Sequence, residues 1–318
     1  MRARSTSRPF AQVDVFGASP FRGNPLAVVL DADGLDEATM RAFASWTNLS
    51  ETTFVLPPTQ EGADYRVRIL TPSTELDFAG HPTLGTAAAW LAAGGVPAGE
   101  RIVQECGAGL VEVRRDEAAG TLAFAAPPLR RSGPLDAEHV GAAAAALGID
   151  PGAVRDHAWV DNGAGWCVLE LGSAAEVLAL APDLAAIPAR KIAALGVVGP
   201  TEADGGVGSD ESDGSDGTDT TGAADGSAGA SGPAYEVRGF VAADPESGTA
   251  GYEDPVTGSL NAGIAQWMLE RGALTPPWTA RQGSALRRDG LVHLDVDADG
   301  TLWVGGTARV DLRGSIDI

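Results

Sequence analysis

Four side chains of this 318-residue chain could move protons or hold a small polar substrate: Glu51, His81, Asp254 and Ser259. Glu51 lies in Asn48-Leu-Ser-Glu-Thr-Thr-Phe-Val55, with apolar residues on both sides. Burial of a carboxylate disfavours its charged form and raises its pKa, which suits a group that accepts and returns protons. Glu51 is therefore a candidate general base, with the other three as candidate partners.

Each of these residues also has a plain structural explanation. A partly buried histidine such as His81 can be a hydrogen-bonded structural residue. Asp254 precedes Pro255, and a loop carboxylate before proline is common turn chemistry. Ser259 can be a helix N-cap. Residue types alone leave both explanations open for all of them.

Two glycine motifs lie where a strand-like segment runs into a helix, and they contain two of the candidates. Gly80-His-Pro-Thr-Leu-Gly85 aligns with Gly258-Ser-Leu-Asn-Ala-Gly263, which places the histidine opposite the serine. Free backbone N–H groups and the positive end of the helix dipole converge at such a terminus. The backbone of Gly80 and Gly258 is therefore a candidate binding site for a substrate carboxylate or a developing enolate.

The two motifs belong to a longer internal repeat. Over fifteen positions from each first glycine, five residues are identical, and Tyr65-Arg-Val-Arg68 recurs as Tyr235-Glu-Val-Arg238 upstream of the second motif. The repeat predicts central helices over Thr83–Ala93 and Leu260–Arg271, each followed by a glycine where a C′ glycine belongs. The first of these helices carries no charge, so we expect it to be buried on all sides.

The segments around these helices alternate between apolar and polar residues and carry turn signals, which predicts strands. The expected strands are Gln12–Phe16, Leu26–Leu30, Thr53–Leu56, Tyr65–Leu70, Gly109–Arg114, Thr121–Phe124, Leu291–Val296 and Thr301–Val304, the last two joined by a turn at Asp297–Gly300. Amphipathic helices are expected outside, at Asp36–Trp46, Asp136–Leu147 and Ala174–Leu180. The predicted fold class is α+β: two pseudo-equivalent lobes, each a curved, barrel-like, mostly antiparallel sheet wrapped around a central buried helix.

The repeat also predicts how the chain is divided. We expect an N-terminal lobe over residues 9–128 and a C-terminal lobe over residues 129–318, with a cleft between them. The second lobe contains an acidic insertion at about 202–232, rich in Gly, Ser, Asp, Thr and Ala and without basic residues. Such a segment cannot bury enough apolar surface to offset its ordering entropy, so we expect it to be flexible.

The charge balance excludes some classes of partner. The chain has 22 basic and 43 acidic residues, a net charge of −21, and Lys191 is its one lysine. Such a surface repels nucleic-acid phosphates and anionic lipid headgroups, so we expect neither nucleic acid nor membrane as a partner. The acid excess is either an ordinary solvated surface or an adaptation to high salt, where screening weakens self-repulsion. The near-absence of lysine favours the adaptation.

Motifs for several common chemistries are missing from the sequence. It has no GxxxxGK[ST], HExxH, GxSxG or strand-linked GxGxxG pattern, so NTPase, zincin, α/β-hydrolase and dinucleotide-dependent activities lack their signatures. Cys106 and Cys167 are isolated, and the histidines are scattered, so we expect no disulfide, no metal site and no cofactor. Without a signal peptide or an apolar stretch long enough to span a bilayer, the chain is expected to be cytoplasmic.

Several ordered motifs together resemble the phenazine-biosynthesis PhzF-like family, which shares the diaminopimelate-epimerase fold. They include Val13-Asp-Val-Phe-Gly-Ala-Ser-Pro-Phe-Arg-Gly-Asn-Pro25, Asn48-Leu-Ser-Glu-Thr-Thr-Phe54, Phe78-Ala-Gly-His-Pro-Thr-Leu-Gly85 and Asp254-Pro-Val-Thr-Gly-Ser259. Arg281-Gln-Gly283 and Val304-Gly-Gly-Thr-Ala308, near the end of the sequence, fit as well. The resemblance runs through nearly the whole chain outside the acidic insertion. It implies two barrel-like lobes, each with a central helix.

The resemblance also implies a function and a set of site residues. It implies an isomerase that needs no cofactor, in which Glu51 moves a proton, His81, Asp254 and Ser259 complete the catalytic set, and Gly80 and Gly258 bind substrate through their N–H groups. The related epimerases use two cysteines as acid and base, and the matching positions here hold none. The substrate is expected to be a small carboxylate bound in the cleft, and the protein a homodimer. The alternative is a non-catalytic binding or dimeric scaffold protein of the same fold.

Overall fold

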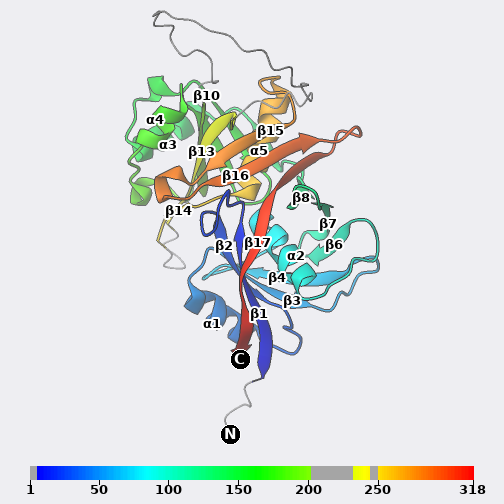
Figure 1. Cartoon of the computed structure of the whole chain (residues 1–318). Coiled ribbons are helices and arrows are strands. Elements are labelled where there is room, and N and C mark those ends of the chain that lie inside the picture. Colours follow the sequence, from blue (N-terminus) through cyan, green and yellow to red (C-terminus); the bar gives the residue numbers. More distant parts are fainter. Residues whose placement is uncertain (1–5, 202–231, 244–249) are drawn as a thin grey trace, which may run out of the picture.

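The computed structural model describes residues 6–201, 232–243 and 250–318. Figure 1 shows two lobes, one built mainly from the first strands of the chain and the other mainly from its central and later strands. The acidic insertion expected at about 202–232 lies outside the described residues, apart from Gly232. The α+β fold with two lobes is confirmed, with each lobe folded around one central helix.

The described residues form runs of strands that are interrupted by single helices. The α-helices are α1 (Glu37–Thr47), α2 (Gly80–Ala92), α3 (Ala137–Leu147), α4 (Ala174–Ala179) and α5 (Gly258–Glu270), with short 3-10 turns η1 (Pro151–Ala153), η2 (Leu184–Ala186) and η3 (Ser284–Leu286). The strands up to residue 133 are β1 (Ser7–Val15), β2 (Asn24–Val29), β3 (Thr52–Leu56), β4 (Tyr65–Leu70), β5 (Glu75–Leu76), β6 (Ile102–Cys106), β7 (Gly109–Asp116), β8 (Thr121–Ala125) and β9 (Arg131–Gly133). The later strands are β10 (Asp156–Asp161), β11 (Trp166–Glu170), β12 (Ala194–Pro200), β13 (Tyr235–Val241), β14 (Tyr252–Asp254), β15 (Trp278–Gln282), β16 (Gly290–Val296) and β17 (Leu302–Asp317).

The central helix α2 is enclosed by the sheet of the first lobe. It contacts β1, β2, β3, β6, β8 and β17, and every residue from Gly80 to Ala89 is buried. A helix with no charged side chain can bury its whole surface without leaving an ion unsolvated. The expectation of an all-round buried helix therefore holds over its first ten residues.

The helix α5 occupies the corresponding place in the second lobe. It contacts β10, β11, β16 and β17, and its buried residues include Leu260, Ile264 and Met268, which recur at helical spacing. Gly94 and Gly272 follow the two central helices with φ angles of +96° and +66°. Both glycines therefore occupy the left-handed position that ends a helix without Cβ strain.

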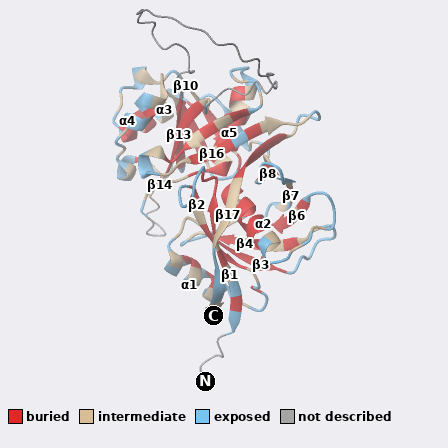
Figure 2. Ribbon diagram, viewed as in Figure 1, coloured by how far each residue is buried: buried red, intermediate tan, exposed pale blue. Residues whose placement is uncertain are grey.

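The outer helices α1, α3 and α4 form where the amphipathic patterns predicted them. Each has a side-chain N-cap: Asp36, Asp136 and Ser173 accept hydrogen bonds from backbone N–H groups of the first turn. Figure 2 shows buried residues concentrated along the strands and central helices, with exposed faces on the three outer helices. These helices cover the sheets rather than form the cleft.

The sequence placed the starts of both central helices too late. The helix α2 begins at Gly80 instead of Thr83, and α5 begins at Gly258 instead of Leu260. Pro82 lies inside the first turn of α2, where proline is tolerated because the N–H groups of that turn have no partner in the helix. The glycines of both motifs are therefore the first helical residues.

The last strand, β17, was also predicted too short, as Thr301–Val304. It continues to Asp317 because its first half pairs with β16 and β8, and residues 308–317 then pair antiparallel with β1. Local alternation does not reveal a partner strand that lies 300 residues earlier in the chain. The division of the chain at about residue 128 stays a prediction. Residues 308–317, which were expected in the C-terminal lobe, pair with β1 in the sheet of the N-terminal lobe.

Two smaller findings complete the fold. Cys106 and Cys167 are both free and buried, so they act as small apolar side chains. Among the described helices, none combines the length and the apolar character needed to cross a membrane.

Candidate active site

Glu51 lies where the outer helix α1 gives way to β3. Asn48 ends the helix with a left-handed φ of 54°, and β3 begins at Thr52. The Glu51 side chain is only 12% exposed, and its Oε2 atom is buried without a hydrogen-bond partner among the described residues. Burial, together with the nearby charge of Asp254, raises the pKa of Glu51 well above its ordinary value, as the sequence predicted.

His81 lies directly beside this carboxyl. Its Nε2 atom is 3.4 Å from Glu51 Oε2, and its side chain is 4% exposed. Burial lowers the pKa of His81 to about 3, so the imidazole is neutral at pH 7 and the contact is not an ion pair. The Nδ1 atom lies 3.3 Å from Asn24 Nδ2, a donor whose two N–H groups already have oxygen acceptors at 3.0 Å; because a proton on Nδ1 would point at this donor, the neutral ring carries its proton on Nε2. The imidazole thus presents an N–H toward Glu51.

Asn24 connects the residues of the two lobes. Its Nδ2 atom also approaches Asp254 Oδ1 at 3.0 Å and the Val256 carbonyl oxygen at 3.0 Å. These two acceptors fix the amide orientation, because a flipped amide would place its oxygen against them. Asn24 is fully buried at the start of β2 and lies in the motif Phe21-Arg-Gly-Asn-Pro25, but sequence reasoning did not select it.

Asp254 ends β14 and is held by four hydrogen bonds, each from a different segment of the chain. Oδ1 accepts from Asn24 and from Ser50 Oγ at 3.4 Å, and Oδ2 accepts from Thr257 Oγ1 at 2.5 Å. Its backbone oxygen accepts from Gln282 Nε2 at 3.0 Å. Burial nevertheless raises the pKa of Asp254, since desolvation outweighs these bonds. Two carboxyls with raised pKa values therefore share one buried site.

Ser259 is the second residue of α5 and is not its N-cap, which is Thr257. The Ser259 hydroxyl accepts a hydrogen bond from Trp166 Nε1 at 3.1 Å, which leaves its own proton free to be donated. Asn162 Nδ2 donates to the Ser259 backbone oxygen at 2.8 Å. The first turn of α5 is therefore anchored to β11 and to the loop after β10.

The first residues of the two central helices meet. A Cβ atom placed on Gly80 would lie 3.0 Å from Gly258 Cα and 2.7 Å from Phe124 Cζ, and one on Gly258 would lie 3.1 Å from Gly80 Cα. Only glycine fits such a backbone approach. The two helix N-termini therefore converge at the junction of the lobes, as the repeat predicted.

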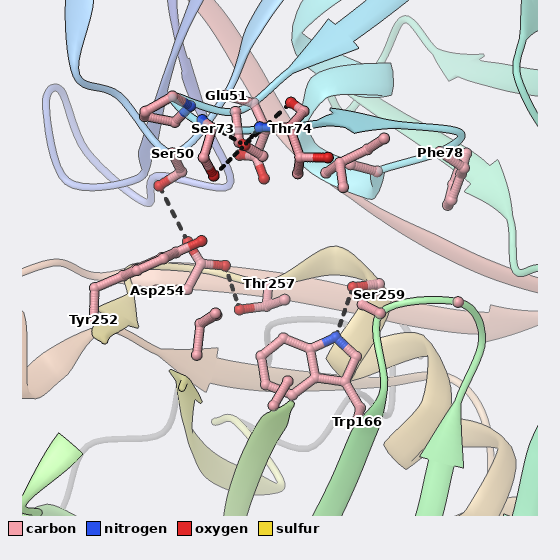
Figure 3. Close-up of a pocket in the computed structure, with 18 of the residues that line it drawn as sticks. Ser50, Glu51, Ser73, Thr74, Phe78, Trp166, Tyr252, Asp254, Thr257 and Ser259 are labelled. Atoms are coloured by element: carbon pink, nitrogen blue, oxygen red, sulfur yellow. Dashed lines mark hydrogen bonds between the residues drawn. The ribbon is translucent and has the colours of Figure 1, made fainter. Parts of the chain in front are cut away.

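A cavity of about 980 Å³ lies against this junction. Figure 3 shows Ser50, Glu51, Ser73, Thr74 and Phe78 on one side, facing Tyr252, Asp254, Thr257, Ser259 and Trp166 on the other. Among the described residues that line the cavity, Arg130 is the one lysine or arginine. The volume suits a small metabolite, and the walls combine apolar surface with many polar side chains from both sides.

The structure brings all the predicted site residues to this junction. Glu51, Asp254 and Ser259 line the cavity, while His81 packs behind Glu51. Sequence reasoning missed Asn24, Ser50, Thr257 and Gln282, which hold Asp254. Their positions inside the quoted motifs are the one signal that could have indicated them. Within the three described ranges, no cluster of three or more His, Cys, Asp or Glu side chains is arranged to hold a metal ion.

Sequence comparison finds a family model that matches nearly the whole chain and several related proteins that match parts of it. The PhzC-PhzF family model, described as phenazine biosynthesis-like protein, matches residues 13–315. Antisense-enhancing sequence 1 of Schizosaccharomyces pombe is 42% identical over 184 residues, 56% of this chain and 62% of that protein. Trans-2,3-dihydro-3-hydroxyanthranilate isomerase of Pseudomonas aeruginosa is 52% identical over 80 residues, 25% of this chain and 28% of that enzyme. An uncharacterized isomerase of Pasteurella multocida is 29% identical over 297 residues, which are 92% of this chain and 89% of that protein.

The chain thus spans less than two thirds of the length of the first curated relatives that it matches. Solved structures match it more completely. A phenazine biosynthesis protein of the PhzF family from Enterococcus faecalis has a TM-score of 0.72 at 25% identity, covering 98% of this chain and 100% of that one. A predicted epimerase from Pseudomonas aeruginosa has a TM-score of 0.70 at 25% identity, covering 97% and 99%. A probable proline racemase from Agrobacterium radiobacter K84, at 12% identity and a TM-score of 0.56, shares the fold, with 98% and 93% covered.

Proposed function

The chain belongs to the phenazine biosynthesis-like (PhzC-PhzF) family, and from this premise we propose that it is an isomerase that moves a proton on a small carboxylate-bearing metabolite. Relatives named as isomerases support the reaction class. We further propose that the reaction takes place in the cavity between the lobes, needs no cofactor and uses Glu51 as the base.

One observation carries the proposal: the wall of the cavity contains a buried carboxyl without a partner. Glu51 Oε2 has no hydrogen bond among the described residues, although it is buried beside His81. An unpaired buried carboxylate destabilises a fold, because nothing replaces its lost water. A carboxylate of raised pKa is also a stronger base than an ordinary glutamate. This basicity, which proton transfer requires, explains why an unpaired carboxyl is present at a cost in stability.

The substrate is held at its anionic end in this proposal. The N-termini of α2 and α5 present their first N–H groups at the junction of the lobes, and Arg130 supplies a positive charge among the lining residues. Helix termini and arginine both stabilise carboxylates. The Ser259 hydroxyl has a free proton for a further hydrogen bond to the substrate. A carboxylate held here leaves the adjacent carbon within reach of Glu51.

Proton transfer then follows from the arrangement of the remaining groups. Ionised Glu51 removes a proton from a substrate carbon, the protonated carboxyl exchanges with water at some stage, and Glu51 then returns a proton to another carbon or to the other face of the same one. His81 Nε2 lies 3.4 Å from Glu51 Oε2, and neither atom has a hydrogen-bond partner among the described residues, so the neutral imidazole leaves the carboxylate unpaired and basic. Asp254, already bonded to Asn24 and Thr257, orients polar groups of the substrate.

Deuterium incorporation tests this assignment. Trans-2,3-dihydro-3-hydroxyanthranilate, the compound in the name of one relative, is the first compound to assay, followed by carboxylates that raise the melting temperature of the protein. Turnover in D₂O should leave deuterium on a substrate carbon. Glu51→Gln should lower kcat by at least about 10²-fold, with ligand affinity unchanged within a few fold. Glu138→Gln, an exposed change on α3, is the matched control and should retain wild-type rates.

The competing function is a non-catalytic binding or dimeric scaffold protein of the same fold. Such a protein has no use for an unpaired carboxyl in its cavity. Wild-type protein that binds a carboxylate but never exchanges a carbon-bound proton, or a Glu51→Gln variant as fast as the wild type, would favour the binder. The expected homodimer can be tested separately by light scattering of the purified protein.

A further inference from the structure

Tyr252 lies two residues before Asp254 on the short strand β14. Alternate side chains of a strand point to the same face, so Tyr252 and Asp254 share one face while Glu253 points to the other. Tyr252 and Asp254 both line the cavity. Figure 3 shows the tyrosine ring beside the Asp254 carboxyl, on the side of the cavity opposite Glu51. Tyr252 is therefore part of the cavity wall, beside Asp254 and across the cavity from Glu51.

The opposite face of β14 fixes the orientation of the strand. Glu253 accepts two hydrogen bonds from Arg238, from Nε at 2.9 Å and from the terminal nitrogen Nη2 at 2.7 Å, and the two side chains are 6% and 10% exposed. A bidentate pair of this kind holds a planar fork against a planar carboxylate and resists rotation. The strand also pairs with β13, which places Tyr252 opposite Val241. The backbone that carries Tyr252 is thus fixed both by the pairing with β13 and by the ion pair on the opposite face of β14.

Tyr252 is a neutral hydrogen-bond donor at physiological pH. Burial, and then the charges of Asp254 and Glu51, raise its pKa above the ordinary tyrosine value. The phenol lines the same cavity as both carboxyls, on the side of Asp254 and facing Glu51 (Figure 3). Among the described residues, no side chain or backbone group forms a hydrogen bond with the Tyr252 hydroxyl.

The neighbouring carboxylates cannot donate a hydrogen bond to the substrate, as this phenol can. When ionised, Glu51 and Asp254 only accept hydrogen bonds, and the oxygens of Asp254 already accept from Asn24, Ser50 and Thr257. Removal of a proton from a carbon next to a carbonyl or carboxyl group leaves negative charge on that group's oxygen. The helix N-termini, Arg130 and Ser259 bind the charge that the substrate carries from the start, and a further donor on the wall of the cavity stabilises the charge that develops during the reaction.

We propose that Tyr252 is a catalytic residue whose hydroxyl donates a hydrogen bond to the substrate oxygen that becomes negative while Glu51 holds the substrate proton. The inference rests on the proposed isomerase function and adds a residue to it. The phenol keeps its own proton throughout, so proton balance is carried by Glu51 alone. A donor aimed at an oxygen that becomes charged acts mainly on the transition state, and therefore on kcat.

The variant Tyr252→Phe tests this role because it removes one oxygen atom and keeps the ring. We expect kcat to fall about 10²-fold, within the range for loss of one such donor, with KM unchanged within about threefold. The rate of deuterium exchange into substrate should fall by the same factor, since exchange also passes through the charged intermediate. The melting temperature should stay near that of the wild type.

Tyr235→Phe is the matched control. Tyr235 is buried in β13, and its hydroxyl accepts a hydrogen bond from Trp278 Nε1 at 3.3 Å, away from the residues that line the cavity. This variant should lose stability while keeping kcat. A Tyr252→Phe kcat within threefold of wild type would overturn the inference, as would a variant in which KM alone changes.

The outcome separates this inference from the proposed function. If turnover requires Glu51 but not Tyr252, the isomerase assignment stands and the donor role of Tyr252 is wrong. If the wild-type protein shows neither turnover nor exchange with any carboxylate that binds it, the proposed function fails, and the catalytic role of Tyr252 fails with it.

Discussion

The two lobes repeat one backbone arrangement. In the first lobe Arg68, on β4, donates to Glu75 on β5 with Nε–Oε1 at 2.7 Å; in the second, Arg238 on β13 donates to Glu253 on β14 with Nε–Oε1 at 2.9 Å. Leu70 pairs with Glu75, and the corresponding Phe240 pairs with Glu253. The same strand register and the same bidentate ion pair therefore occur twice.

The chemistry does not repeat with the backbone. Leu70 and Phe240 are equivalent positions of the repeat, and they pair with Thr52 and Leu195, which are therefore equivalent as well. The residue before each of these is Glu51 in the first lobe and Ala194 in the second. The second residues of the central helices are His81 and Ser259. The backbone is duplicated but the proposed base is not. The fold therefore needs the strand register and the glycines in both lobes, whereas the proposed reaction needs the Glu51 carboxyl of the first lobe alone.

The largest expected difference between the lobes concerns the two ion pairs. Arg238→Met leaves Glu253, 10% exposed, as an unpaired buried charge and should destabilise the protein by about 3–5 kcal/mol. Arg68→Met should cost no more than about 1 kcal/mol, because Arg68 and Glu75 are 26% and 34% exposed. Urea unfolding of both variants measures the difference.

A double variant sharpens this comparison. Arg238→Met with Glu253→Leu removes both charges and should recover much of the lost stability, since no uncompensated ion remains. Equal losses for Arg68→Met and Arg238→Met would show that burial of the ion pair does not distinguish the lobes.

The next effect concerns the glycines where the lobes meet. Gly80→Ala should destabilise the protein by about 1–3 kcal/mol, because its Cβ would lie 2.7 Å from Phe124 and 3.0 Å from Gly258. Gly141→Ala, in α3, is the control; its Cβ meets no atom within 4 Å, and it should stabilise the helix by about 0.5–1 kcal/mol. A stable Gly80→Ala protein with an unchanged melting temperature would contradict the close approach of the helices.

The smallest effect is the pH dependence of stability due to Glu51. Its folded-state pKa is raised, so the folded state binds the proton more tightly, and wild-type stability falls as pH rises from about 4.5 through the raised pKa. Glu51→Gln cannot ionise. It should match the wild type near pH 4 and exceed it by about 0.5–2 kcal/mol near pH 8, as measured by thermal unfolding across pH.

Glu75→Gln provides the opposite sign within the same lobe. The hydrogen bond from Arg68 lowers the pKa of Glu75, so its ionised form stabilises the fold at neutral pH and that contribution is lost as pH falls. Glu75→Gln should therefore be slightly less stable than wild type near pH 8. A Glu51→Gln variant that is less stable than wild type near pH 8 would show that the Glu51 carboxylate is well stabilised in the fold.

Part of this arrangement was predictable from the sequence. Helices such as α1 and α3 were placed within one residue, because their periodicity and their caps Asp36 and Asp136 are local signals. The two central helices and their glycines followed from the repeat. Strands β6, β10, β11, β12 and β15 and the short strands β5, β9 and β14 were not identified. The start of α2 was misplaced because Pro82 resembles a boundary and not a first turn.

The sequence by itself determined which residues could do chemistry and the local elements that carry them, since caps, periodicity and motifs act over a few positions. Only the tertiary structure decided which groups meet. Asn24, Glu51 and His81 join Asp254 because β17 returns to pair with β1 and brings the end of the chain to its beginning. The raised pKa values also depend on this meeting, because desolvation requires walls from both lobes.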